Sequence, residues 1–246
     1  MSTSKKTALV TGAANGIGKA IATRLVSEGY FTILADVDEE NGQKQAAALG
    51  KSAEFRKCNI SDEKSVETLF MYIKEKYSSL DVLVNNAGII RDNVIWRMPV
   101  EDFDKVIEIN LRGTWLMCRQ AAMLMRPLNK GRIVNISSRA WLGNRGQSNY
   151  AASKAGVVGM TRVLALELGA NGILVNAIAP GLIDTPLTQK LPADVQEKLI
   201  EAQPTKSMGT PDDIAQAVAF LCDDKTKFIT GQTIYVDGGK SIGAGL

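Results

Sequence analysis

The chain has 246 residues, of which 45% are hydrophobic, and its 29 basic and 26 acidic residues leave a formal net charge of +3. This balance excludes the strong single-sign charge of a nucleic-acid-binding or membrane-surface protein. The chain contains no histidine, which excludes a Ser-His-Asp triad and histidine-rich metal sites, so acid–base chemistry must use tyrosine, lysine, cysteine or a carboxylate.

Short β-rich runs alternate with longer helical patterns. The predicted strands are Thr7–Thr11, Phe31–Ala35, Ala53–Cys58, Asp81–Val84, Arg132–Ile136, Leu174–Ile178 and Thr233–Val236. Helices are predicted up to about Glu28, from about Asp38, over about Asp62–Tyr77, Val100–Arg126 and Tyr150–Leu168, and from Pro211. This alternation predicts parallel strands joined by right-handed crossovers. We expect one domain over residues 1–246, an α/β fold with a doubly wound, Rossmann-like parallel sheet and helices on both faces.

One segment, from Pro186 to about Gly209, interrupts the alternation because it is polar, punctuated by prolines and only partly helical. Loops that follow strands in an open α/β sheet lie on the ligand-binding side. We interpret residues 186–209 as a mobile lid over a substrate site, and an ordinary surface insertion is the alternative.

The stretch Thr11–Gly18 (TGAANGIG) links the first predicted strand to the first helix. Gly12 allows a tight exit from the strand, Gly16 lets a pyrophosphate approach the backbone, and Gly18 permits close packing of helix on strand. The helix amino terminus offers N–H groups and a positive dipole end to phosphates. The loop therefore predicts a dinucleotide site, which also includes Asn15 and Ile17.

Asp36 follows the second predicted strand, where an acidic side chain accepts hydrogen bonds from the adenosine ribose hydroxyls. A 2′-phosphate would meet a like charge there, and no basic residue stands at Asn15 or Val37 to neutralise it. Asp36 therefore favours NAD over NADP. Its alternative role is a helix cap, although Asp38 is at least as well placed for that.

Tyr150 and Lys154 stand one helical turn apart on a predicted helix, so they share a face. The lysine ammonium and a positive nicotinamide ring would lower the phenol pKa by about 2–3 units from its usual value near 10. Tyr150 would then take the hydroxyl proton as hydride leaves an alcohol, or return it during reduction. The alternative for such a pair is a packed ring beside a surface lysine.

Together with Asn85–Gly88 (NNAG) and Pro180–Gly181, these motifs resemble those of the short-chain dehydrogenase/reductases, and the resemblance covers essentially the entire chain. Asn85–Met98 and Phe228–Gly239 look most like 3-oxoacyl-[acyl-carrier-protein] reductases. The resemblance implies further cofactor contacts at Asn59, Ile60, Asn86, Ala87, Gly88, Pro180, Gly181, Ile183 and Thr185.

The resemblance also implies a serine that hydrogen-bonds the substrate oxygen after the fifth strand. Counting from the strand indicates Ser138, whereas counting back from Tyr150 indicates Ser137. We favour Ser138, because strand register sets side-chain direction while loops absorb deletions. Asn110 matches the family asparagine that relays protons through water to Lys154, and a polar kink in a long helix is its alternative.

The leading interpretation is an NAD-dependent oxidoreductase that interconverts an apolar or cyclic secondary alcohol and a ketone. Its pocket would be walled by Trp96, Trp141, Leu142 and Leu187, each of which is equally compatible with the core. The alternative is an NADH-linked 3-oxoacyl reductase that acts on carrier-protein or coenzyme A thioesters. Arg126, Lys130 and Arg132 would supply positive charge near its site, and a solvated loop is the other explanation for these three residues. Asp36 argues against the NADP that such reductases usually prefer. A non-catalytic nucleotide-binding scaffold is a remote alternative, because it gives no reason to keep the four catalytic residues together.

The resemblance further implies a homotetramer assembled through the helices near Val100–Arg126 and Tyr150–Leu168, with the tail Lys240–Leu246 helping to close the site. We recognise no secretory signal and no run long enough to span a membrane, so we expect a cytoplasmic protein. The three cysteines have no zinc-site spacing, and no metal, nucleic-acid or membrane partner is expected.

Overall fold

The computed structural model describes residues 5–186 and 188–242. Seven strands form one sheet in the order β3-β2-β1-β4-β5-β6-β7, and every neighbouring pair is parallel. The predicted doubly wound α/β fold is therefore confirmed. The strands are β1 Thr7–Thr11, β2 Phe31–Asp36, β3 Ala53–Lys57, β4 Val82–Asn85, β5 Gly131–Ile136, β6 Ile173–Pro180 and β7 Thr233–Val236.

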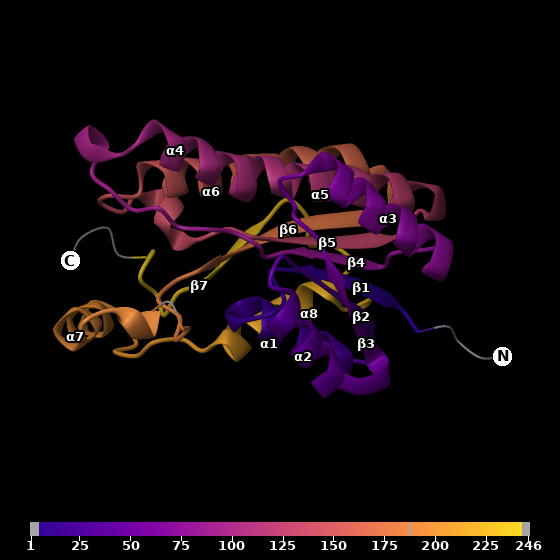
Figure 1. Ribbon diagram of the computed structural model, residues 1–246, viewed down its shortest axis with the longest axis horizontal. Helices are drawn as coiled ribbons and strands as arrows, with labels where there is room; N and C mark the ends of the chain where they lie inside the picture. The colour runs from indigo at the N-terminus through magenta and orange to yellow at the C-terminus, as the bar shows by residue number, and fades with distance from the viewer. Residues whose placement is uncertain (1–4, 187, 243–246) are drawn as a thin grey trace.

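Helices cover both faces of the sheet. They are α1 Gly16–Ser27, α2 Glu39–Leu49, α3 Glu63–Tyr77, α4 Val100–Ile107, α5 Thr114–Met125, α6 Ser148–Leu168, α7 Ala193–Glu201 and α8 Pro211–Cys222. Figure 1 shows α3, α4, α5 and α6 over one face and α1, α2 and α8 over the other. Within the described ranges, no helix has both the length and the apolar character needed to cross a bilayer.

The central strands are buried because the helical layers cover them on both sides. All residues of β1 and β4 are buried, as expected for continuous apolar runs in a parallel sheet. One apolar cluster, which includes Ile73 and Met117, fills the layer under α3 and α5. A second cluster, which includes Leu25 and Val218, fills the layer under α1 and α8.

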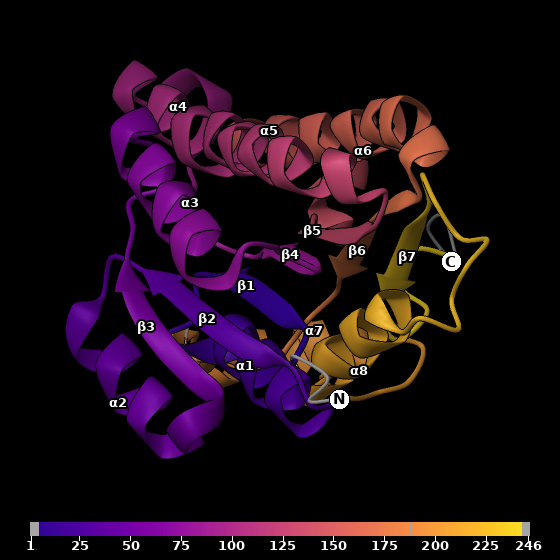
Figure 2. The ribbon, with the colours of Figure 1, turned by 90° about the vertical axis from the view of Figure 1, so that its right-hand side faces the viewer.

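The strand order places the ligand-binding edge of the sheet. The chain runs outward from β1 through β2 to β3, then returns to the other side of β1 to form β4. This reversal creates a topological switch point between β1 and β4, and open α/β sheets bind ligands there, at the carboxyl ends of the strands. The helix α7 lies outside the two helical layers, and Figure 2 shows the same sheet turned by 90°.

The single helix predicted over Val100–Arg126 is interrupted, so this expectation was wrong in detail. A π-helical segment, Glu108–Gly113, separates α4 from α5. The wider turn leaves the Asn110 carbonyl to accept a hydrogen bond from the Thr114 hydroxyl at 2.7 Å. Such π-helical turns are frequent at functional sites, and this one contains the predicted site residue Asn110.

Candidate active site

The glycine loop between β1 and α1 is shaped by close backbone approaches. Gly12 and Gly16 have φ angles of +63° and +53°, which favour glycine. A Cβ atom on Gly12 would lie 2.8 Å from the Ala87 Cα, and one on Gly18 would lie 2.0 Å from the Gly12 carbonyl oxygen. Side chains at Gly12 and Gly18 would therefore collide with the backbone that forms the loop.

The amino terminus of α1 has the properties of a phosphate site. Asn15 occupies the N-cap position without a side-chain hydrogen bond to the helix, and the first turn, which includes Ile17, contains no acidic residue. The N–H groups and the positive end of the dipole are thus available to an anion. Thr185 approaches the same loop, because a Cβ on Gly16 would lie 4.0 Å from its Cγ2. These residues fit the pyrophosphate of a dinucleotide.

Two carboxylates lie at the carboxyl end of β2. Asp36 accepts hydrogen bonds from the backbone N–H groups of Ala14 at 2.9 Å and Asp38 at 3.0 Å. Asp38 caps α2 by accepting from the Asn41 N–H, and hydrogen bonds from Asn41 lower the pKa of Asp38. Asp36 therefore does not cap the helix, and its carboxylate lies beside the glycine loop.

The segment after β4 connects the glycine loop to Lys154. The Asn86 amide donates to the carbonyls of Thr11 and Gly12, both at 3.0 Å. The Ala87 N–H donates to the Thr11 hydroxyl at 3.1 Å. Gly88 follows, and a Cβ there would lie 3.6 Å from the Lys154 Nζ.

The other predicted cofactor residues follow β3 and end β6. Asn59 and Ile60 follow β3, and Ile60 is buried against the π-helical segment, where a Cβ on Gly113 would lie 2.9 Å from its Cδ1. Pro180 ends β6, and the Gly181 N–H donates to a β7 carbonyl at 3.0 Å. All of these positions lie at the carboxyl edge of the sheet.

The predicted lid leaves and rejoins the body at one point. The Asp184 N–H donates to the Gly209 carbonyl at 2.8 Å, and Ile183 beside them is buried. Lys240 donates from its Nζ to the Ala202 carbonyl, at the end of α7, at 2.8 Å. The interpretation of residues 186–209 as a mobile lid stays a prediction. Residues 243–246 of the expected closing tail lie outside the described residues.

Tyr150, Lys154 and Ser138 converge at the carboxyl end of β5. The Lys154 Nζ lies 5.6 Å from the centre of the Tyr150 ring and donates to the Ile136 carbonyl at 2.8 Å. Ser138 follows the same end of β5 and acts on the phenol, because it lowers the pKa of Tyr150. The two side chains expected to contact a substrate oxygen therefore lie on the same side of the sheet.

The two candidate serines face different surroundings. Ser137 is buried, and its hydroxyl donates to the Lys154 carbonyl at 3.0 Å. Ser138 is half-buried, lowers the pKa of the phenol and accepts from the Ala140 N–H at 3.1 Å. The role of Ser138 in contacting the substrate stays a prediction.

Asn110 is fully buried and links two parts of the site. Its Oδ1 accepts from the Ile89 N–H at 2.8 Å, and its Nδ2 donates to the Ile89 carbonyl at 2.9 Å. The same Nδ2 lies 3.3 Å from the Ser153 hydroxyl. Asn110 thus holds the segment after Gly88 against α6, beside the lysine.

Burial shifts the pKa values of Tyr150 and Lys154 in opposite directions. Desolvation raises the pKa of Tyr150, and the negative charge of Asp92 adds to this, whereas the hydrogen bond from Ser138 opposes it. Desolvation also lowers the pKa of Lys154 to about 8. The expected lowering of the phenol pKa is therefore not found in the protein alone, because the charged forms of both groups lose hydration.

Three residues near the phenol were missed in the sequence. Asn149, Gln147 and Asp92 join the start of α6 to the segment after β4, with the Gln147 Nε2 donating to the Asp92 Oδ2 at 2.8 Å. Asn149 is fully buried. An asparagine inside the first turn of a helix, where its propensity is low, was the available signal.

Only some of the residues expected to form an apolar wall around the substrate lie within the described part of the chain. Trp96 and Leu142 are 72% and 48% exposed, and Trp141 is half-buried. Leu187 lies outside the described residues. The wall around the substrate therefore stays a prediction.

The positive charge expected near the site is elsewhere. Lys130 and Arg132 lie at the amino end of β5, where Lys130 pairs with Asp81 at 3.1 Å. Arg126 precedes them at the end of α5. Ser138 lies past the opposite end of β5, so the expectation that these three residues charge the active site was wrong.

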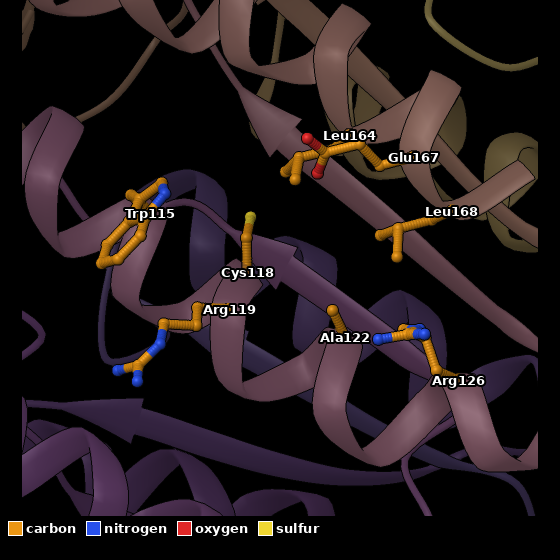
Figure 3. A pocket seen from close by; sticks show the side chains of 8 residues that line it. All are labelled: Trp115, Cys118, Arg119, Ala122, Arg126, Leu164, Glu167 and Leu168. Carbon is orange, nitrogen blue, oxygen red and sulfur yellow. The ribbon is translucent and has the colours of Figure 1, made fainter.

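A separate cavity of about 430 Å³ lies between α5 and α6, away from the catalytic residues (Figure 3). Trp115, Cys118, Arg119, Ala122 and Arg126 reach it from α5, and Leu164, Glu167 and Leu168 reach it from α6. The cavity opens on the outer face of these helices, not on the carboxyl edge of the sheet.

Comparisons with known proteins agree over nearly the whole chain. Residues 12–241 match a family model described as enoyl-(acyl carrier protein) reductase. The chain is 43% identical, over 100% of both lengths, to the (2S)-[(R)-hydroxy(phenyl)methyl]succinyl-CoA dehydrogenase subunit of Thauera aromatica. It is 42% identical to the 3-oxoacyl-[acyl-carrier-protein] reductase of Thermotoga maritima, over 95% of this chain and 97% of that protein. The crystal structure of levodione reductase superposes with a TM-score of 0.93 at 36% identity, covering 96% of this chain and 98% of that one.

Proposed function

Because the chain belongs to the short-chain dehydrogenase/reductase family, we propose that it interconverts a ketone and a secondary alcohol with NAD(H), using Tyr150 as general acid and base. The observation that supports this best is the convergence of Tyr150, Lys154 and Ser138 next to the segment that carries Gly88. A scaffold protein would not need a buried lysine beside a phenol, because burying both groups destabilises the fold.

The chain's own residues perform the proton chemistry. A bound nicotinamide would supply or accept the hydride. In reduction, Ser138 donates a hydrogen bond to the ketone oxygen and Tyr150 transfers its phenol proton to that oxygen. Lys154 then returns a proton toward the phenolate, and Asn110 holds the neighbouring backbone for a water relay. Because burial raises the phenol pKa, Tyr150 is protonated near neutral pH, which favours the reductive direction.

NADH is the proposed cofactor because two carboxylates, Asp36 and Asp38, lie where the adenosine ribose would bind. Asn15 donates to Asp38 at 3.2 Å and brings no positive charge to this point. A 2′-phosphate would therefore face repulsion from these two carboxylates.

A 3-oxoacyl thioester is the second candidate substrate. Relatives covering nearly all of the chain are named as 3-oxoacyl-[acyl-carrier-protein] reductases, and another acts on a succinyl-CoA derivative by its name. An apolar or cyclic ketone is the first candidate, because exposed apolar side chains, including Trp96, lie on the segment after β4.

The first test measures absorbance of the reduced nicotinamide with NADH and NADPH, over simple ketones and 3-oxoacyl thioesters. We expect NADH-dependent turnover that Tyr150→Phe abolishes and that Tyr77→Phe, on α3, leaves unchanged. Cofactor binding without turnover of any substrate would refute the proposal and support a scaffold. Turnover of thioesters alone would make the second candidate the correct one.

We also propose a homotetramer that covers the outer face of α5 and α6. Apolar side chains are exposed there: Trp115, Met123, Val163 and Leu166. The cavity between these helices contains Arg126 and Glu167, which form no ion pair within residues 5–186 and 188–242. When two copies are related by a twofold axis, Arg126 of one copy can pair with Glu167 of the other. Leu166→Glu should reduce the mass measured by light scattering, and an unchanged mass would count against this assembly.

A further inference from the structure

We propose that Asn149 is the positioning residue for the general acid–base tyrosine, because it ties the first turn of α6 to the segment Arg91–Asn93 and so holds the phenol beside Ser138. This inference rests on the proposed function, since it concerns the placement of Tyr150 for proton transfer.

The side chain of Asn149 is fully buried, and both ends of its amide are used. Its Oδ1 accepts from the Tyr150 N–H at 2.7 Å, and its Nδ2 donates to the Arg91 carbonyl at 2.8 Å. A longer contact of 3.5 Å joins the Nδ2 to the Asp102 carbonyl at α4. The residue next to the tyrosine is therefore anchored to two other segments.

The start of α6 needs this anchor because it lacks an ordinary cap. The helix begins at Ser148, and Gln147 at the N-cap position makes no side-chain hydrogen bond to the helix. The first N–H groups of a helix have no partner within it. Asn149 supplies the acceptor for the Tyr150 N–H and fixes that residue's backbone. Small rotations of an unanchored first turn would move the phenol at the far end of its side chain.

The segment bonded to Asn149 is also the one that lines the cofactor side of the site. Arg91–Asn93 follows Asn86–Gly88, and Asn110 holds the intervening Ile89. Two further contacts join this segment to the same end of α6: the Asn93 N–H donates to the Gly146 carbonyl at 2.9 Å, and Gln147 donates to Asp92. Asn149 thus fixes the first turn of α6 against Arg91–Asn93, while Asn110 independently holds the backbone next to Gly88.

The experiment compares the wild type with Asn149→Ala, Asn149→Ser and the control Asn144→Ala. Serine keeps a small polar group at this position but is too short to reach the Arg91 carbonyl. Asn144 belongs to the same loop, is exposed and bonds only to the Gln147 Oε1 through its side chain. Each variant is measured for kcat, KM of ketone and cofactor, NADH affinity and thermal unfolding.

We expect both Asn149 variants to lose about 10- to 100-fold in kcat, the scale of effect that small misplacements of a catalytic group produce. NADH affinity should change less than about twofold, and the pH dependence of kcat should keep its shape, because misplacement lowers the rate without changing charge. Asn144→Ala should retain wild-type kcat.

A wild-type kcat in Asn149→Ser would overturn the inference, because it would show that the bond to Arg91 is unnecessary. Equal losses of kcat and NADH affinity would also overturn it, because they indicate general disorder. If Asn149→Ala does not fold, the serine variant decides the outcome. Tyr150→Phe is included so that the two ideas separate: wild-type activity in Tyr150→Phe refutes the proposed function, whereas its loss, with activity kept in Asn149→Ser, refutes only the positioning role.

Discussion

Replacing Lys154 with methionine should make the protein more stable at neutral pH while abolishing its activity. The Lys154 side chain is buried, and desolvation lowers its pKa to about 8 from 10.5. At about 1.36 kcal/mol per pKa unit, holding the ammonium inside the fold costs about 3 kcal/mol at pH 7, where the lysine is charged in both the folded and the unfolded chain. Methionine has a similar length and no charge to bury.

Methionine also removes the hydrogen bond from Nζ to the Ile136 carbonyl, a loss of about 1 kcal/mol. The net gain of Lys154→Met at pH 7 is therefore about 2 kcal/mol, which corresponds to a rise of about 4–8 °C in Tm for a domain of this size. The sign depends on pH. As the pH rises through 8, the folded lysine loses its proton, and the cost of burying it diminishes until the unfolded lysine also titrates near 10.5.

Urea unfolding of both proteins at pH 7 and pH 9.5 measures this difference. We expect the gain to shrink to about zero at pH 9.5, where the remaining cost of burial and the lost hydrogen bond are both about 1 kcal/mol. Lys74→Met, at an exposed position on α3, should change stability by less than about 0.5 kcal/mol at either pH. A destabilised Lys154→Met at pH 7, or a gain independent of pH, would refute the reasoning.

Three further substitutions test other parts of the site. Asp92→Asn removes a negative charge that raises the phenol pKa of Tyr150. In a pH–rate profile, the alkaline decline of the reduction rate should therefore begin at lower pH. An unchanged profile would show that the charge of Asp92 does not affect the phenol. Asp36→Ala should lower the ratio of kcat/KM for NADH over NADPH by about tenfold or more, because like charges at an interface cost several kcal/mol, and an unchanged ratio would contradict the NADH assignment. Gly18→Ala should abolish NADH binding in a fluorescence titration, because its Cβ would lie 2.0 Å from the Gly12 carbonyl oxygen. The control Gly159→Ala, whose Cβ would have nothing within 4 Å, should bind NADH normally. Normal binding by both variants would show that the glycine loop can rearrange to accept the methyl group.

Features set by local pattern were predictable from the sequence. The runs around β1 and β4 are mostly apolar because helices cover both faces, and this pattern is recognisable even in a stretch as short as Thr7–Thr11. The burial of Ser137, which leaves Ser138 as the more accessible of the two serines, agrees with the strand register, which loop lengths do not alter. Asp38 was recognisable as a cap because it directly precedes the first turn of α2.

Features that depend on contacts between distant segments were not predictable. The π-helical segment around Asn110 depends on packing against Ile60, which follows a different strand. The role of Asn149 depends on Arg91, which the fold brings beside α6. Charge placement failed for a similar reason, since Arg132 is close to Ser138 in sequence but lies at the other end of β5.

The direction of the phenol pKa shows why burial must be known before chemistry is assigned. Sequence reasoning considered the charges of Lys154 and the nicotinamide, which stabilise the phenolate, but not desolvation, which opposes it. With Lys154 buried and Tyr150 half-buried, Tyr150 stays protonated near neutral pH and Lys154 titrates near pH 8. A protonated phenol is the form that donates to a ketone, and a lysine that titrates in this range can return the proton after each turnover. The burial that costs stability in the Lys154→Met comparison is therefore the same property that adapts the pair to reduction, so a lysine pKa restored toward 10.5 by greater solvent access should stabilise the fold and slow the reaction together.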